Sequence, residues 1–87
     1  MTQYDFAMEK VTLAILSVTD AFMLNDPSAI AQECADARQV YEYIRQLYLK
    51  LQLNAGERDS LLAQMDLLGS QLDHCKVVLR RPIAVEG

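Results

Sequence analysis

The sequence predicts an all-α protein, an antiparallel up-down-up three-helix bundle with heptad-like seams. Apolar residues recur in alternating steps of three and four along three stretches, the spacing of helices packed lengthwise on one another. Turn signals separate these stretches at residues 25–27 and 53–56. Only two Pro and three Gly occur in 87 residues, which disfavours a turn-rich β fold. An alternative is a helical hairpin whose first helix is exchanged into a partner chain in a dimer.

The first helix is expected at about residues 3–24, because Thr2 and Asp5 have the spacing of an N-cap and its acidic third position. Its predicted inward seam is Tyr4, Met8, Val11, Ile15, Val18 and Phe22. Beside the seam, every seventh residue is small and would allow a close helix approach: Ala7, Ala14 and Ala21.

A second apolar strip on the first helix consists of Leu13, Leu16 and Leu24. A helix that is apolar on two sides lies either inside a fold or at an interface. A three-helix bundle has nothing to cover the second strip. The strip therefore predicts a protein partner, and a homodimer is preferred because most soluble oligomers are homo-oligomers.

The second helix is expected at about residues 27–53 as the central one, with Asp26 as N-cap and Pro27 at the first helical position. Its predicted seam is Ile30, Cys34, Ala37, Tyr41, Ile44, Tyr48 and Leu51. Val40 and Leu47 widen this stripe, so the helix can contact two neighbours.

The second helix also carries a candidate binding surface composed of Arg38, Tyr43 and Arg45, since Arg and Tyr commonly anchor protein interfaces. The plainer interpretation is preferred. In it, Glu42 pairs with the two arginines along the helix, and Tyr43 is an isolated surface aromatic residue.

The third helix is expected at about residues 55–79, with Asn54 and Glu57 forming its N-terminal cap. Its predicted seam is Leu61, Met65, Leu68, Leu72, Cys75 and Leu79. Gly69 in its middle indicates either a close helix crossing or a weak point. Residues 1–81 should form a single helical domain, and residues 82–87 a flexible C-terminal tail that begins at Pro82.

Antiparallel pairing about Asn54 brings Cys34 level with His74 and Cys75, since each lies about twenty residues from the turn. The preferred interpretation is two buried free thiols. A Cys34–Cys75 disulfide is one alternative. A metal site of Cys34, His74 and Cys75 is another, although paired Cys-x-x-Cys spacing is missing.

The net charge of −4 disfavours nucleic acid and anionic membranes as partners. The apolar run of residues 11–24 contains Asp20 and is too short to span a bilayer. Acidic residues stand near the N-terminus, where a signal peptide would be positively charged, and two Cys do not make a disulfide framework. These observations predict a cytoplasmic protein.

No catalytic set is recognisable, and no cofactor is expected. Asp59, Asp66 and Asp73 form an acidic row that is best interpreted as a solvated surface, although such a row can also meet a basic partner. The sequence therefore predicts a non-enzymatic protein–protein interaction module: a small helical adaptor, chaperone or regulator. The alternative is a metal- or redox-responsive helical protein that uses Cys34, His74 and Cys75.

Overall fold

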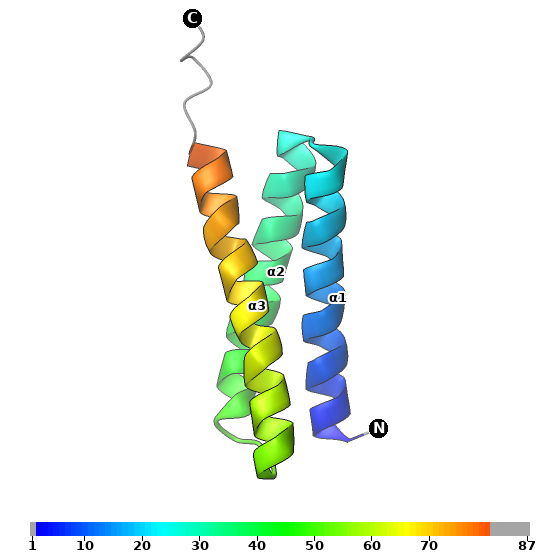
Figure 1. The fold of residues 1–87 in the computed structure, drawn as a ribbon, viewed down its shortest axis with the longest axis vertical. Coiled ribbons are helices and arrows are strands. Elements are labelled where there is room, and N and C mark those ends of the chain that lie inside the picture. Colours follow the sequence, from blue (N-terminus) through cyan, green and yellow to red (C-terminus); the bar gives the residue numbers. More distant parts are fainter. Residues whose placement is uncertain (1, 81–87) are drawn as a thin grey trace, which may run out of the picture.

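A computed structural model describes residues 2–80 of the chain, which form three helices joined by short connections (Figure 1). They are α1 (Gln3–Leu24), α2 (Pro27–Tyr48) and α3 (Ala55–Arg80). The chain runs up, down and up, so α1 and α3 are parallel, and each helix contacts the other two. No strand occurs within residues 2–80. The three-helix bundle is confirmed, whereas the predicted tail at residues 82–87 lies outside the described residues.

All three predicted N-caps are present. The side chains of Thr2, Asp26 and Asn54 accept hydrogen bonds from nearby backbone N–H groups at 3.0, 3.1 and 2.8 Å. At the other end of α1, Asn25 adopts a left-handed conformation with φ 55°, and its N–H donates to the Ala21 carbonyl oxygen. Because these signals act over a few residues, the sequence located the helix starts and the first turn correctly.

The prediction that the second helix extends to residue 53 is wrong, since α2 ends at Tyr48. Hydrogen bonds at this end span three residues instead of four, as in a tightened last turn. Beyond it, Leu51 and Leu53 are half-buried while Gln52 between them is exposed. Apolar residues at every second position are typical of an extended segment, and this signal outweighs the helical spacing of Leu51.

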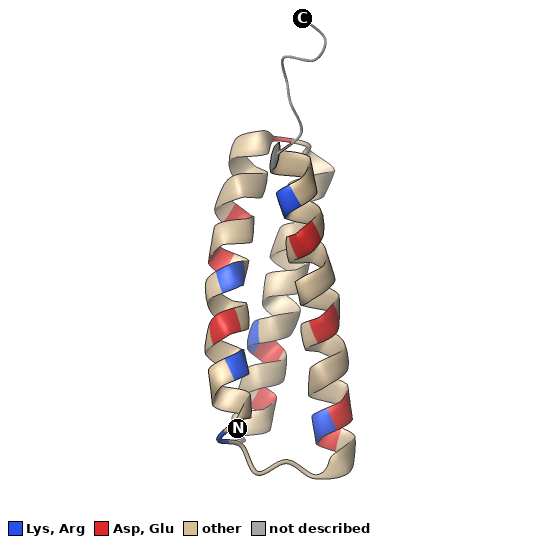
Figure 2. Cartoon of the chain, turned by 90° about the vertical axis from the view of Figure 1, so that its left-hand side faces the viewer, with Lys and Arg blue, Asp and Glu red and all other residues tan. Residues whose placement is uncertain are grey.

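Charged residues occur along all three helices (Figure 2). Among the described residues no polar or charged residue is buried, and a single ion pair joins the exposed Arg45 and Glu42 at 3.9 Å. One side-chain hydrogen bond connects two helices: the Gln71 amide donates to the Thr19 hydroxyl at 2.9 Å. Apolar contact therefore provides most of the stabilisation of the bundle.

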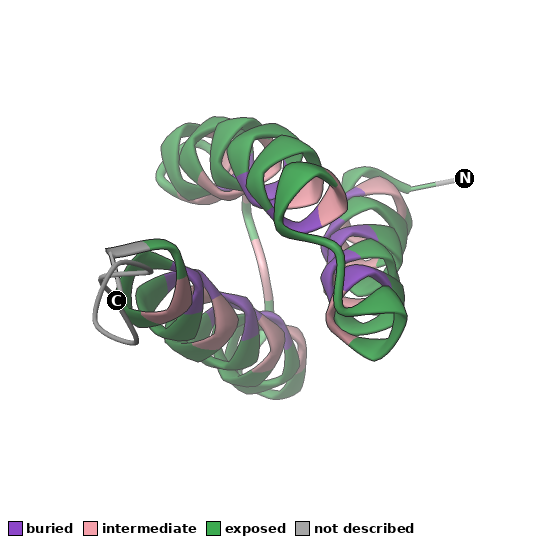
Figure 3. Cartoon of the chain, turned by 90° about the horizontal axis from the view of Figure 1, so that it is seen from above, coloured by how far each residue is buried: buried purple, intermediate pink, exposed green. Residues whose placement is uncertain are grey.

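Burial follows one line along each helix, facing the centre of the bundle (Figure 3). The seams predicted for α2 and α3 are confirmed at most positions, whereas Leu79 is exposed. For α1 the predicted seam lies to one side of the observed one, because the buried line consists of Ala7, Val11, Ala14, Val18 and Ala21. The larger residues of the predicted seam flank that line and are half-buried: Tyr4, Met8, Ile15 and Phe22. Small residues occupy the line because they let α1 approach its neighbours closely.

Gly69 of α3 lies beside the Tyr41 ring of α2. A Cβ atom at this position would lie 3.5 Å from Cε2 of the Tyr41 ring. That distance is an ordinary van der Waals contact with a side chain, so both meanings predicted for this glycine stay predictions.

Candidate protein-interaction surface

Cys34 of α2 and Cys75 of α3 form a disulfide, with their Cα atoms 6.5 Å apart. The preferred prediction of two free thiols is therefore wrong. Counting residues from the turn at Asn54 placed the two cysteines at one level correctly. Their Cα separation is within the ~7 Å that a disulfide allows. Both residues are almost fully buried, at 5% and 1% exposure, so the bond is shielded from reductants in solution.

His74 does not join the two cysteines. Its ring lies against the Phe22 ring of α1, with the ring centroids 5.1 Å apart. Adjacent residues on a helix point in different directions, so His74 turns outward where Cys75 turns inward. Within residues 2–80 no group of three potential ligands comes together. A sulfur held in a disulfide also lacks the thiolate that binds a metal.

The predicted leucine strip of α1 is exposed, but its members face two sides. Leu13, Leu16 and Leu24 are 50%, 54% and 72% exposed. At about 100° per residue, Leu24 lies about 20° from Leu13, whereas Leu16 is turned about 60° away. Leu13 borders a hollow between α1 and α2, and the turn of about 60° carries Leu16 away from it, to a position one heptad before Met23.

Arg38, Tyr43 and Arg45 likewise do not form one surface. The Tyr43 ring packs edge-on against Phe6 of α1, with centroids 6.4 Å apart. Arg38 instead borders a hollow of about 570 Å³ between α2 and α3, where acidic and basic side chains are mixed. Arg45 pairs with Glu42. The sequence could not reveal this division, because it depends on which neighbour each side of α2 meets.

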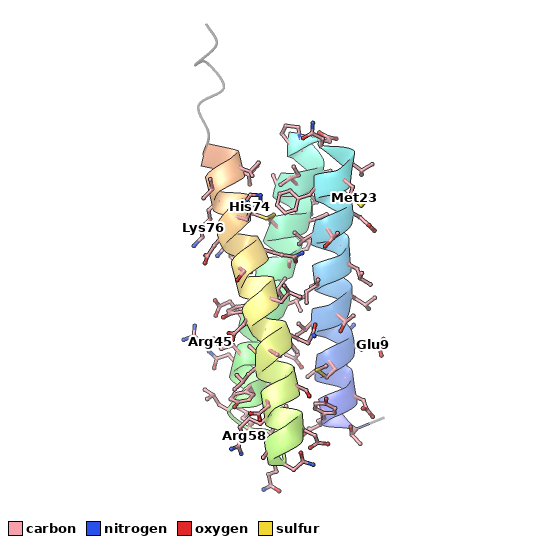
Figure 4. All side chains as sticks on the ribbon, viewed as in Figure 1. Glu9, Met23, Arg45, Arg58, His74 and Lys76 are labelled. Atoms are coloured by element: carbon pink, nitrogen blue, oxygen red, sulfur yellow. A yellow bond between two sulfur atoms is a disulfide. The ribbon has the colours of Figure 1, made fainter. Side chains whose placement is uncertain are left out.

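The most apolar hollow along α1 is a groove of about 480 Å³ between α1 and α3, hereafter the α1–α3 groove. Its lining residues are Thr19, Phe22, Met23, Leu67, Ser70, Gln71 and His74. Met23 is 78% exposed and Leu67 is 48% exposed, which is unusual for large apolar side chains. Figure 4 shows Met23 and Glu9 on the outer side of α1, whereas Lys76 and Arg45 point away from α1.

Two heptad series continue the lines of groove residues along both helices, and the sequence reasoning missed them. Residues seven apart share one side of a helix, so the lining residues identify the rest of each series. On α1 the series is Thr12, Leu16, Thr19 and Met23. On α3 it is Ser60, Ala63, Leu67, Ser70, His74 and Val77. All ten residues are exposed and none is Lys, Arg, Asp or Glu. The spacing was visible in the sequence, but the small and hydroxyl residues concealed it.

Comparisons with protein-family models, curated proteins and solved structures return no match for this chain. None of the helices within residues 2–80 has the length and apolar character needed to cross a membrane. The fold and its exposed surface define a three-helix bundle with an uncharged, mainly apolar hollow between α1 and α3.

Proposed function

We propose that this chain is a non-enzymatic protein–protein interaction module, a small helical adaptor, chaperone or regulator, that binds its partner in the α1–α3 groove. The observation that carries the proposal is the exposure of Met23 and Leu67 at one apolar hollow, with Leu16 exposed one heptad before Met23 on α1. Large apolar side chains grouped on a monomer surface commonly mark a protein-binding site. An amphipathic helix laid in a groove between two helices is a recurrent mode of recognition.

A non-enzymatic role is supported by the distribution of polar groups. Catalytic acids, bases and nucleophiles commonly lie where burial and neighbouring charges change their pKa values. In residues 2–80 no polar or charged residue is buried, and the most apolar groove offers mainly hydroxyl, amide and apolar groups. Such a surface is suited to binding.

The proposal can be tested by photo-crosslinking in the native host. A photoreactive amino acid replaces Leu16 in one variant and, as the matched control, Arg45 in another, because both sites are exposed on different sides of the bundle. We expect an adduct of defined mass from position 16 and none from position 45. The adduct mass also separates a second copy of this chain from a different protein. Equal adducts from both positions, or none from position 16, would contradict the proposal.

A matching substitution is Leu16→Asp, which should abolish the adduct formed through a crosslinker placed at Thr12. Because Leu16 is 54% exposed, the fold should tolerate the change, with a loss of stability below about 1 kcal/mol. Circular dichroism and urea unfolding provide the check. Loss of the helical signal in this variant would place Leu16 in the core and contradict the assignment of the surface.

The cytoplasmic location expected from the sequence stays a prediction. The Cys34–Cys75 disulfide argues in the opposite direction, because disulfides persist mainly in oxidising compartments. Alkylation of thiols in intact cells, before and after denaturation, measures whether the two sulfurs are joined in the native host.

A further inference from the structure

We infer that the occupant of the α1–α3 groove is a cationic amphipathic helix of another protein, which packs as a fourth helix. This inference rests on the proposed function and adds the chemistry of the partner to it. Three features of the groove carry it: an uncharged floor, acidic residues mainly on its α1 rim, and the scarcity of described basic side chains beside them.

The floor matches a helix in length and spacing. Thr12 to Met23 on α1 and Ser60 to Val77 on α3 follow the three–four rhythm that keeps side chains in line along a parallel pair of helices. Ser60, Ala63 and Ser70 are small, so a fourth backbone can approach α3 closely. The apolar hollow around Met23 and Leu67 can then receive one large side chain of the occupant.

The rim of the groove is acidic mainly along α1. On α1, Glu9 and Asp20 stand seven residues before and four residues after Leu16, on the same outer side. On α3, Asp59 stands four residues before Ala63, whereas Asp66 and Asp73 border the hollow between α2 and α3 together with Lys76. All five carboxylates are exposed, and Figure 2 shows acidic residues repeating along α3.

The described basic side chains of α1 and α3 lie elsewhere. Lys10 is turned toward α2 and lies over the Phe6 ring, 5.5 Å from its centroid. Lys76 borders the hollow between α2 and α3, together with Asp66 and Asp73. Arg58 reaches back to the Leu53 carbonyl oxygen at 3.4 Å. A helix with an apolar stripe and Lys or Arg on its flanks therefore complements both the floor and the rims.

A second copy of the chain fits these charges less well. If two α1 helices pack antiparallel with Leu13 over Leu16, then Glu9 of one copy faces Asp20 of the other. If they pack in parallel, each carboxylate faces its own counterpart. Neither arrangement brings a basic residue from this side of α1, so self-association would gather like charges, which is unfavourable.

The inference can be tested with two synthetic peptides of about 21 residues, whose helical length of about 32 Å is near that of α1. Both carry the same leucine stripe; one has Lys on the flanks and the other Glu. Binding is followed by fluorescence anisotropy, and the site by NMR shifts of the labelled intact chain. We expect the Lys peptide to bind at least tenfold more tightly, with the largest shifts at Leu16, Met23 and Leu67. Raising NaCl from about 0.05 to 0.3 M should weaken the binding of the Lys peptide about three- to tenfold.

Matched variants separate a specific rim effect from general attraction. Glu9→Gln with Asp20→Asn should weaken the Lys peptide about three- to tenfold. Glu33→Gln with Asp36→Asn removes the same charge from α2 and should leave the affinity within about twofold. Leu67→Asp should abolish the shifts at Leu16 and Met23 while the chain stays helical. If the two double substitutions weaken binding of the Lys peptide equally, the inference is overturned.

Other outcomes distinguish this inference from the proposed function. Equal binding of the two peptides would overturn the cationic partner, although a crosslink from position 16 would still support an interaction module. A crosslinked adduct of twice the chain mass, with a dimer in sedimentation, would identify a second copy as the occupant and overturn the inference alone. Absence of any crosslink from position 16 would overturn the proposed function first.

Discussion

At the scale of single residues, Gly69 lies where the Tyr41 ring of α2 packs against α3. The ring of Tyr41 lies beside the α3 backbone, and the nearest ring atom would be 3.5 Å from an added Cβ. That distance is an ordinary van der Waals contact. The contact therefore does not demand the absence of a methyl group, and the Gly69 backbone is in a helical conformation without positive φ.

We expect Gly69→Ala to raise the free energy of unfolding by up to about 1 kcal/mol, because Gly is less favourable than Ala inside a helix by that amount. Urea unfolding measures the change. Gly56→Ala is the control: it adds the same methyl group near the start of α3, where only the Asn54 side chain is near, and should have a smaller effect. A destabilised Gly69→Ala variant would mean that the Tyr41 ring cannot adjust to the methyl group.

At the scale of elements, each helix contributes a different kind of core residue. The buried line of α1 contains only Ala and Val, whereas that of α3 contains Leu, Met and Cys. Small residues on one helix and large ones on another fill the interior without strain, since protein cores are close-packed. Between α2 and α3 the disulfide adds a covalent link across 41 residues of sequence.

Removing this disulfide should destabilise the bundle strongly. For Cys34→Ala with Cys75→Ala we expect a loss of about 3–4 kcal/mol in the free energy of unfolding, from the loop-closure entropy of a 41-residue separation. Urea unfolding of the double variant against the oxidised protein measures it. The wild-type chain unfolded in reductant should show a similar loss. A change below about 1 kcal/mol would mean that the link constrains the unfolded chain far less than its length implies.

At the scale of the whole molecule, charge has little part in holding the bundle together. Twelve acidic residues stand against eight basic ones, and the described residues form one exposed ion pair. Exposed pairs contribute about 0–1 kcal/mol. The like charges along α1 and α3 repel one another weakly through solvent, so the acidic surface is a small cost to the isolated chain.

The unfolding free energy should therefore rise slightly as NaCl increases from about 0.05 to 0.5 M, by less than about 1 kcal/mol, because salt screens more repulsion than attraction. Thermal or urea unfolding at several salt concentrations checks this. Glu42→Gln removes the ion pair and should change stability by less than about 0.5 kcal/mol. A clear loss of stability with salt would show that attractive charge contacts contribute more than the geometry suggests.

The residue patterns predicted the helices and their starts well, because these depend on neighbours within about four positions. They failed where two local signals competed, as after Tyr48, where alternating leucines form an extended connection. For α1, the sequence analysis assigned the buried seam to large apolar side chains and placed the alanines beside it. The geometry reverses this order, because the helix approaches its neighbours most closely along its smallest residues.

The sequence by itself determined three amphipathic helices, their caps, the level pairing of Cys34 with Cys75, and an acidic surface, since spacing and composition encode these directly. Only the tertiary structure decided that the two sulfurs bond and that the Tyr41 ring contacts Gly69. It also decided that Tyr43 and Arg38 face different neighbours of α2, and that α1 and α3 share an uncharged groove. These features depend on the rotation and axial register of each helix against the others, which no pattern within one helix specifies.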